Sequence, residues 1–229
     1  MKKFAVLIVS ALLLLMMPQA VAANTVIRIT APLHQTFTGE FRNDDLAQLL
    51  TPSGDLGLKV FQPIAKNRTW VIDPALVDEV ILMANEYTLA TEAEPAGKEI
   101  ASMWLTQLKR VTAGNDVVAL AYGNPDVALA KRLAPSELKN YYVYGQNRLQ
   151  LALGRIVRSE PGVQWSVGKS GLSNPLRKSY SENRKALTRL SRVVDTPELI
   201  HLRARLAQLL SPTLDKSSRE YFSYSATAA

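Results

Sequence analysis

The sequence contains no cysteine and only two histidines, and these absences exclude several kinds of chemistry. Without cysteine there can be no disulfide, no cysteine-ligated zinc and no thiol nucleophile. The histidines, His34 and His201, stand 167 positions apart (201 minus 34), whereas a deacetylase-type metal site needs two histidines at close spacing with an aspartate. Nucleophile-elbow, phosphate-loop and metalloprotease motifs are also missing. We therefore expect no metal and no cofactor.

Long hydrophobic runs are absent beyond the first 22 residues, which have the three parts of a secretory signal. Lys2 and Lys3 precede the apolar stretch Phe4–Met17, and Ala20-Val21-Ala22 offers a small-residue cleavage site. The alternative is an uncleaved anchor, but the apolar stretch has 14 residues, and a membrane span needs roughly 20. We expect export, with the mature chain secreted or peripheral to the outer face of the cell membrane.

Acidic and basic residues are distributed unevenly. Residues 23–130 hold 8 basic and 13 acidic side chains, whereas residues 131–229 hold 17 basic and 7 acidic ones. A basic half outside the cell could meet an anionic membrane surface or an anionic wall polymer, or could consist of ordinary solvated helix faces. Nucleic acid is a poor partner for an exported chain that lacks an aromatic-basic motif. Helices carrying both leucine and arginine predict a contact surface built from Arg184, Lys185, Arg189, Arg192, Arg203 and Arg205.

Two segments repeat one pattern, an apolar run of strand length that stops at an Asp or Asn next to proline and continues with helical spacing. They are residues 69–80, with Asp73-Pro74, and residues 117–132, with Asn124-Pro125-Asp126. Asp or Asn suits a helix N-cap and Pro suits the first helical position, so Asp73 and Asn124 are expected caps. The pattern predicts strand–turn–helix units of an α/β protein.

The remaining segments extend this pattern to about four strands. The predicted fold is α/β, either a partial (β/α) barrel or an open parallel sheet, followed by a helical C-terminal third. We divide the chain into a signal at 1–22, an α/β core at 23–168 and a basic helical region at 169–229. Strands are expected at Thr25–Thr30, Thr69–Ile72, Asp116–Ala121 and Val163–Val167, and helices from Asp44, Asp55, Pro74, Lys98, Pro125, Ser136 (through Arg158), Asn174 and Pro197.

The repeated segments resemble those of a family of exported actinobacterial proteins of unknown function. The likeness includes MWLTQLKR, which lies between them, and APLHQTFTGEFRNDDLAQLLTPSGDLGLKV, which precedes them. The likeness covers roughly residues 27–158. It implies a barrel-like core distantly similar to polysaccharide deacetylases, and a gene neighbouring that of the lipid II flippase. Members carry flanking modules and a terminal membrane helix that this chain lacks, so it resembles a shortened member.

The strand ends supply the candidate site residues. Asp73 and Asp126 could serve as general acid and base, with His34 on the same edge, although an Asp at a helix start is also an ordinary cap. Tyr122, Asn124 and Trp165 could line a ligand site, although aromatics in strands are more often core. The leading expectation is a non-enzymatic envelope protein associated with peptidoglycan assembly or lipid II export, with envelope membrane proteins such as the flippase as partners. The alternative is a carbohydrate-active hydrolase or deacetylase-like enzyme using the strand-end carboxylates.

Overall fold

Four parallel strands lie side by side in the order in which they occur along the chain. The computed structural model describes residues 25–36, 39–62, 68–163, 174–193 and 196–210. The strands pair in the order β1-β2-β3-β4, with Ile27 opposite Trp70 and Trp70 opposite Val117. The α/β class with an open parallel sheet of four strands is therefore confirmed. The strands are β1 (Thr25–Ile29), β2 (Arg68–Ile72), β3 (Asp116–Ala119) and β4 (Arg158–Ser159).

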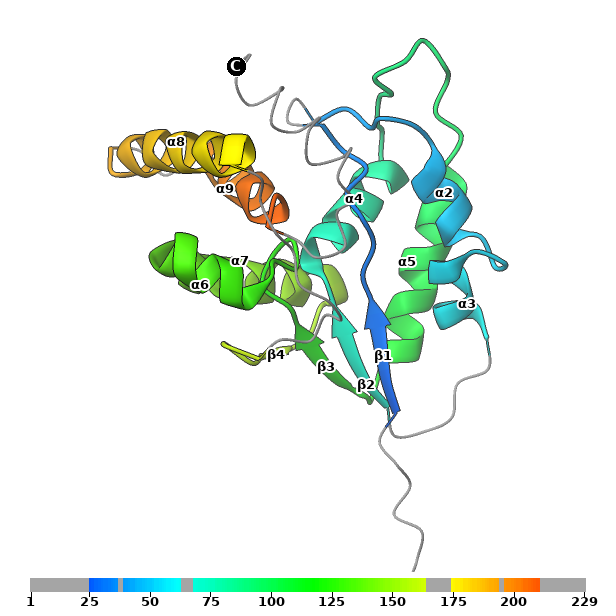
Figure 1. The fold of residues 1–229 in the computed structure, drawn as a ribbon. Helices are drawn as coiled ribbons and strands as arrows, with labels where there is room; N and C mark the ends of the chain where they lie inside the picture. Colours follow the sequence, from blue (N-terminus) through cyan, green and yellow to red (C-terminus); the bar gives the residue numbers. More distant parts are fainter. Residues whose placement is uncertain (1–24, 37–38, 63–67, 164–173, 194–195, 211–229) are drawn as a thin grey trace, which may run out of the picture.

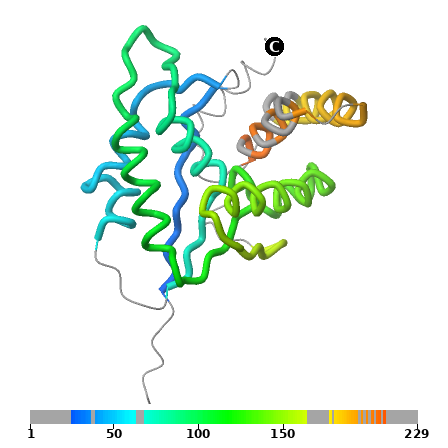
Figure 2. The backbone as a smooth tube through the Cα atoms, turned by 180° about the vertical axis from the view of Figure 1, so that it is seen from behind, coloured from blue at the N-terminus to red at the C-terminus, as the bar shows by residue number. Residues whose placement is uncertain are grey.

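Helices fill every connection between the strands (Figure 1). Two short helices join β1 to β2, namely α2 (Asp45–Leu50) and α3 (Asp55–Phe61), and α4 (Pro74–Ala84) and α5 (Lys98–Thr112) join β2 to β3. The connection to β4 contains α6 (Val127–Leu133) and α7 (Pro135–Leu153), and α8 (Asn174–Ser191) and α9 (Pro197–Gln208) follow β4. Figures 1 and 2 both show α2, α3 and α5 beside β1, and α6 to α9 on the side of β3 and β4.

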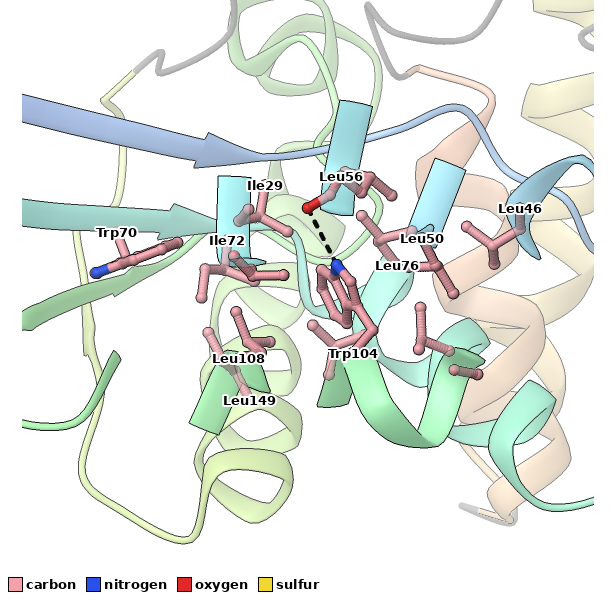
Figure 3. Close-up of a cluster of buried hydrophobic side chains, with 14 of the residues drawn as sticks. Ile29, Leu46, Leu50, Leu56, Trp70, Ile72, Leu76, Trp104, Leu108 and Leu149 are labelled. Atoms are coloured by element: carbon pink, nitrogen blue, oxygen red, sulfur yellow. Dashed lines mark hydrogen bonds between the residues drawn. The ribbon is translucent and has the colours of Figure 1, made fainter. Parts of the chain in front are cut away.

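The main hydrophobic core lies between one face of the sheet and the connecting helices. Crossovers between parallel strands share one hand, and the strand order never reverses, so the connections are expected on one face. Alternate strand residues such as Ile29, Ile72 and Ala119 accordingly share a buried cluster with side chains of α2, α3, α4, α5 and α7. Figure 3 shows Trp104 of α5 in this cluster, where its indole N–H donates to the carbonyl oxygen of Leu56 at 3.1 Å. The core thus fixes the carboxyl ends of β1, β2 and β3 relative to α4.

Two sequence expectations, for the end of α7 and for the start of α6, are wrong, and a third lies mostly outside the described residues. The fourth described strand is Arg158–Ser159, and we expected Arg158 to be the last residue of a helix. Helix α7 instead ends before Gly154, whose φ of 67° gives a left-handed C-cap. The expected strand Val163–Val167 lies mostly outside the described residues, and Val163 itself is not in a strand. Residue Asn124 does not cap α6, because Asp126 is the N-cap and α6 begins at Val127.

The C-terminal helices form a hairpin against α6 and α7. Leu187 of α8 and Leu206 of α9 are buried in a second cluster with Leu138 and Tyr141 of α7. Thr196 caps α9 by accepting from the N–H of Leu199, and the helix begins at Pro197, as expected. Within the described ranges, none of the helices is both long enough and apolar enough to cross a bilayer. The expected signal, residues 1–22, and Trp165 lie outside these ranges.

Candidate functional site

The carboxyl ends of β2 and β3 bring Asp73 and Asp126 to one edge of the sheet, as expected. Both side chains are buried, with 3% and 4% of their surface exposed. Each carboxylate accepts a hydrogen bond from the first turn of its own helix. This geometry is that of an N-cap, in which the side chain satisfies an amide that the helix leaves unpaired.

Asp73 does more than cap α4. Its Oδ1 accepts from the N–H of Ala75 at 3.0 Å and from the N–H of Gly123 at 3.1 Å, so it joins the end of β2 to the turn after β3. Burial raises the pKa of Asp73 to about 7 despite these two donors, and the negative charges of Glu79 and Asp78 add to the increase. The neutral acid and the carboxylate are therefore both accessible near neutral pH.

The turn from Gly123 to Asp126 explains why Asn124 is not the cap. Gly123 and Asn124 have φ values of 78° and 44°, a left-handed conformation that glycine and asparagine adopt most readily. The chain thereby reverses before Asp126, whose Oδ1 accepts from Leu129 N–H at 2.9 Å. The N–H of Asp126 donates to the carbonyl oxygen of Leu210, which attaches the turn to the segment after α9. Asn124 is 3% exposed, and its amide nitrogen has no hydrogen-bond partner among the described residues.

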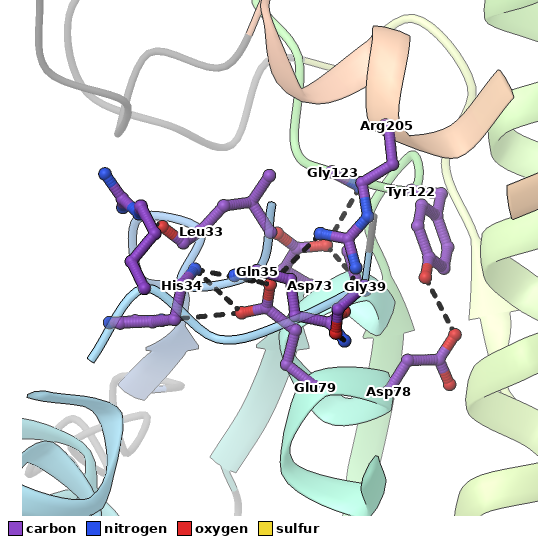
Figure 4. Close-up of polar contacts among 12 residues, drawn as sticks. Leu33, His34, Gln35, Gly39, Asp73, Asp78, Glu79, Tyr122, Gly123 and Arg205 are labelled. Atoms are coloured by element: carbon purple, nitrogen blue, oxygen red, sulfur yellow. Dashed lines mark hydrogen bonds and ion pairs between the residues drawn. The ribbon is translucent and has the colours of Figure 1, made fainter. Parts of the chain in front are cut away.

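A buried ion pair between Glu79 and Arg205 forms the centre of the site (Figure 4). Their side chains are 1% and 4% exposed, and Arg205 Nη1 lies 3.2 Å from Glu79 Oε1. The same carboxylate accepts from the backbone N–H of Gln35 at 3.0 Å, and His34 Nδ1 lies 3.4 Å from Oε2. Burial by itself would favour neutral Glu79, but the hydrogen bond with His34 and the charge of Arg205 outweigh it, so the pKa of Glu79 is lowered.

The guanidinium of Arg205 also donates to the side-chain oxygen of Gln35, whose amide nitrogen donates to the Gly39 carbonyl oxygen at 2.7 Å. The network therefore joins three segments, namely the loop after β1, the first half of α4 and the C-terminal helix α9 (Figure 4). His34 takes part in it as a partner of Glu79. The arrangement can hold these segments in one geometry, because each charge has an opposite charge or a dipole beside it.

A second polar group lies on the other side of α4. Arg148 of α7 makes a forked contact with Asp78, with Nη2–Oδ1 at 2.8 Å and Nε–Oδ2 at 2.9 Å. Tyr122 donates its hydroxyl to Asp78 Oδ2 at 2.9 Å, and its ring lies 4.8 Å from that of Tyr144. Burial and the charge of Asp78 raise the pKa of the Tyr122 hydroxyl well above its ordinary value. Tyr122, a predicted ligand residue, is thus 4% exposed and hydrogen bonded within the fold.

The expected basic surface needs a correction. Arg205 is buried against Glu79, and Arg203 Nε lies 2.9 Å from Glu137 Oε2 with its side chain 17% exposed. These two arginines attach α9 to the rest of the fold instead of facing a partner. Of the other four expected cations, Lys185, Arg189 and Arg192 are exposed on or just after α8, and Arg184 is half-buried. Arg177 and Lys178, which we did not predict for this surface, are exposed on the same helix.

Sequence reasoning missed Glu79 and Asp78, although a signal was present. Both stand within PALVDEVILMA, a helix that is apolar on most sides, and such a helix buries whatever charges it carries. Their partners are 126 and 70 positions away, at Arg205 and Arg148, and no local spacing indicates that pairing. Over the described residues, no group of three or more His, Asp or Glu side chains could hold a metal ion.

These features define an α/β protein with a buried polar network at the carboxyl edge of a sequentially ordered parallel sheet. Comparisons with protein-family models, with curated proteins and with solved structures give no match. The resemblance to the exported family of unknown function therefore stays a prediction.

Proposed function

We propose that this protein is exported and acts in the cell envelope by binding, not by catalysis, near peptidoglycan assembly or lipid II export. The observation that carries the binding role is the exposed row of cations on α8. Residues 174–193 contain six basic residues and one acidic residue, and Arg177, Lys178, Lys185, Arg189 and Arg192 remain exposed after the hairpin has packed. Leu190 and Val193, which are 55% and 82% exposed, lie in the same segment.

An anionic membrane surface matches this combination of charge and apolar side chains. Each basic side chain near such a surface contributes about 1 kcal/mol, and exposed apolar side chains add burial in the headgroup region. The N-terminal sequence supports the compartment, since residues 1–22 have the pattern of a secretory signal. The family resemblance supports the process, with envelope membrane proteins such as the lipid II flippase as candidate partners.

The strand-end carboxylates support a non-catalytic role. Asp73 and Asp126 are turned back onto amides of their own helices, and Glu79 is paired with Arg205. A glycosidase-like pair would instead face a cleft with its carboxyl groups about 5–10 Å apart.

Vesicle sedimentation tests the membrane contact. Wild-type protein is expected to bind anionic vesicles and not neutral ones, and to bind more weakly as salt rises. The double variant Lys185→Gln/Arg189→Gln should weaken binding by on the order of tenfold or more. The matched control Lys109→Gln/Arg110→Gln removes two exposed cations from the end of α5 and should leave binding within about twofold. Equal loss in both variants, or binding indifferent to lipid charge and salt, would reject α8 as the contact.

A second function is favoured by one observation, the pKa of Asp73. A carboxyl group with a pKa of about 7 suits a general acid or base, which is what a carbohydrate-active enzyme would need. Asp73→Asn separates the two functions, because asparagine caps a helix as well as aspartate but cannot transfer the proton. The binding function predicts that Asp73→Asn still supports envelope growth when wild-type protein is depleted. A folded Asp73→Asn protein that fails to do so would favour the enzyme.

A further inference from the structure

A cavity of about 460 Å³ lies between the end of α4, the start of α5 and the loop after β1, where Gln35 and Gly39 of the polar network also line it. Its size falls within the range of about 300–1,000 Å³ that is typical of small-ligand sites. Phe41, Leu82 and Pro95 supply apolar walls, and Leu82 is 40% exposed. Further lining comes from Gln35, Gly39, Asn85, Glu86, Tyr87, Thr88 and Lys98.

Two opposite charges line this cavity. Glu86 follows the end of α4, and Lys98 is the first residue of α5. Neither side chain has an ion-pair or hydrogen-bond partner within the described part of the chain, and neither is paired with the other. The partial charge of each helix end has the same sign as the side chain beside it. The carboxyl end of α4, next to Glu86, is partly negative, and the amino end of α5, at Lys98, is partly positive. The cavity therefore presents a negative side and a positive side.

The walls of the cavity are held in place before any ligand arrives. Tyr87 donates its hydroxyl to Asp44 Oδ1 at 2.5 Å and accepts from the N–H of Gly97 at 2.7 Å. Burial, together with the bond to Asp44, raises the pKa of Tyr87 to about 12, so the hydroxyl keeps its proton. The rings of Phe41 and Tyr87 meet edge to face at 5.0 Å, and Phe41 exchanges backbone hydrogen bonds with Thr88 and Ala90. A preformed site loses little free energy to ordering on binding.

We propose that this cavity binds a short peptide with free termini and an apolar side chain, of dipeptide size. The α-ammonium group lies at Glu86, the α-carboxylate lies at Lys98, and the apolar side chain contacts Leu82 and Pro95. Charge-assisted hydrogen bonds of this kind are stronger than neutral ones, and a ligand carrying both charges satisfies both sides of the cavity at once. This site goes beyond the membrane contact of α8, and neither depends on the other.

Calorimetric titration of the full mature protein with alanyl-leucine tests the site. Acetylating the amine of the dipeptide or amidating its carboxylate should each weaken binding about tenfold. Glu86→Gln should abolish the preference for the free amine but keep the preference for the free carboxylate, and Lys98→Gln should do the reverse. The matched controls Glu99→Gln and Lys109→Gln change exposed charges of α5 that do not line the cavity, and they should bind like wild type.

The crossed pattern of preferences separates a specific site from general electrostatics. Equal binding of free and blocked dipeptides would overturn the proposal, as would absence of binding at millimolar concentration by protein whose thermal unfolding is normal. Equal loss in the cavity variants and in the α5 controls would overturn it too. All four substituted residues are exposed, so the variants are expected to fold, and circular dichroism melts verify this.

Discussion

Removing the charge of Arg205 should destabilise the protein far more than removing a surface arginine. In Arg205→Met, the Glu79 carboxylate stays buried at 1% exposure with the backbone N–H groups of His34 and Gln35 and the imidazole of His34 as remaining partners. Leaving one member of a buried pair without its partner costs about 3–5 kcal/mol. Domains are stable by only about 5–15 kcal/mol, so this loss is a large fraction of the total.

Two further variants separate the pair from its surroundings. Arg205→Met/Glu79→Gln removes both charges of the pair and should recover about 2–3 kcal/mol of the loss, because position 79 no longer carries a buried charge without its partner. Arg158→Met is the control, since Arg158 pairs with Asp116 at 44% and 42% side-chain exposure and should cost about 1 kcal/mol or less.

Urea unfolding followed by circular dichroism measures these free energies, and hydrogen exchange locates the effect. Amides of α9 should exchange faster in Arg205→Met, while those of α5, which lies beside β1 at the other end of the fold, should change little (Figures 1 and 2). This prediction fails if Arg205→Met costs no more than Arg158→Met. It also fails if Arg205→Met/Glu79→Gln loses as much stability as Arg205→Met and Glu79→Gln, each measured alone, lose together.

Three further predictions concern the carboxyl edge of the sheet. Because the folded-state pKa of Asp73 is raised to about 7 from 3.8, the folded state binds the extra proton, and stability should fall by on the order of 4 kcal/mol as pH rises from about 4 to about 7. Asp73→Asn should lack that fall, which urea unfolding at pH 5 and pH 8 measures; identical pH profiles would contradict it. Asp126→Ala removes the acceptor of the Leu129 N–H and should cost about 1 kcal/mol in thermal melts, whereas Asp126→Asn should cost clearly less. Gly145→Ala would place a methyl group 2.7 Å from the Leu120 carbonyl oxygen and should cost about 1–3 kcal/mol, although alanine is the better helix former; an unchanged urea midpoint would show that the backbone yields.

The first three strands were predictable from the sequence, whereas the fourth was not. β2 and β3 are apolar runs that stop at a polar turn, and that local pattern is enough to identify them. β4 has two residues, Arg158 and Ser159, and they form a strand because they pair with Val118 and Ala119 at the edge of β3. Ile156 continues the apolar spacing of α7, which led us to extend that helix, yet it is 91% exposed. Local pattern cannot reveal pairing that depends on a strand elsewhere.

The site was predictable in position but not in chemistry. Asp73 and Asp126 reach the expected edge because both follow strands of one parallel sheet. Their role as caps was one of the two alternatives that the sequence left open. Asn124 is not the cap because the turn requires its left-handed φ of 44°. Asparagine is common both as a helix N-cap and as a left-handed turn residue, so the sequence could not distinguish these two roles.

The polar network at this edge is better explained by positioning than by stability. Burying Glu79, Arg205 and Gln35 carries a desolvation cost that pairing only offsets, and apolar side chains of similar volume often do as well or better. Apolar packing of α9 alone would tolerate a shift along α7, since hydrophobic contact has no direction. A guanidinium that must meet both the Glu79 carboxylate and the Gln35 amide oxygen permits far fewer arrangements. The network therefore fixes where the α8–α9 hairpin lies on the fold, and with it the place from which the cations of α8 face outward.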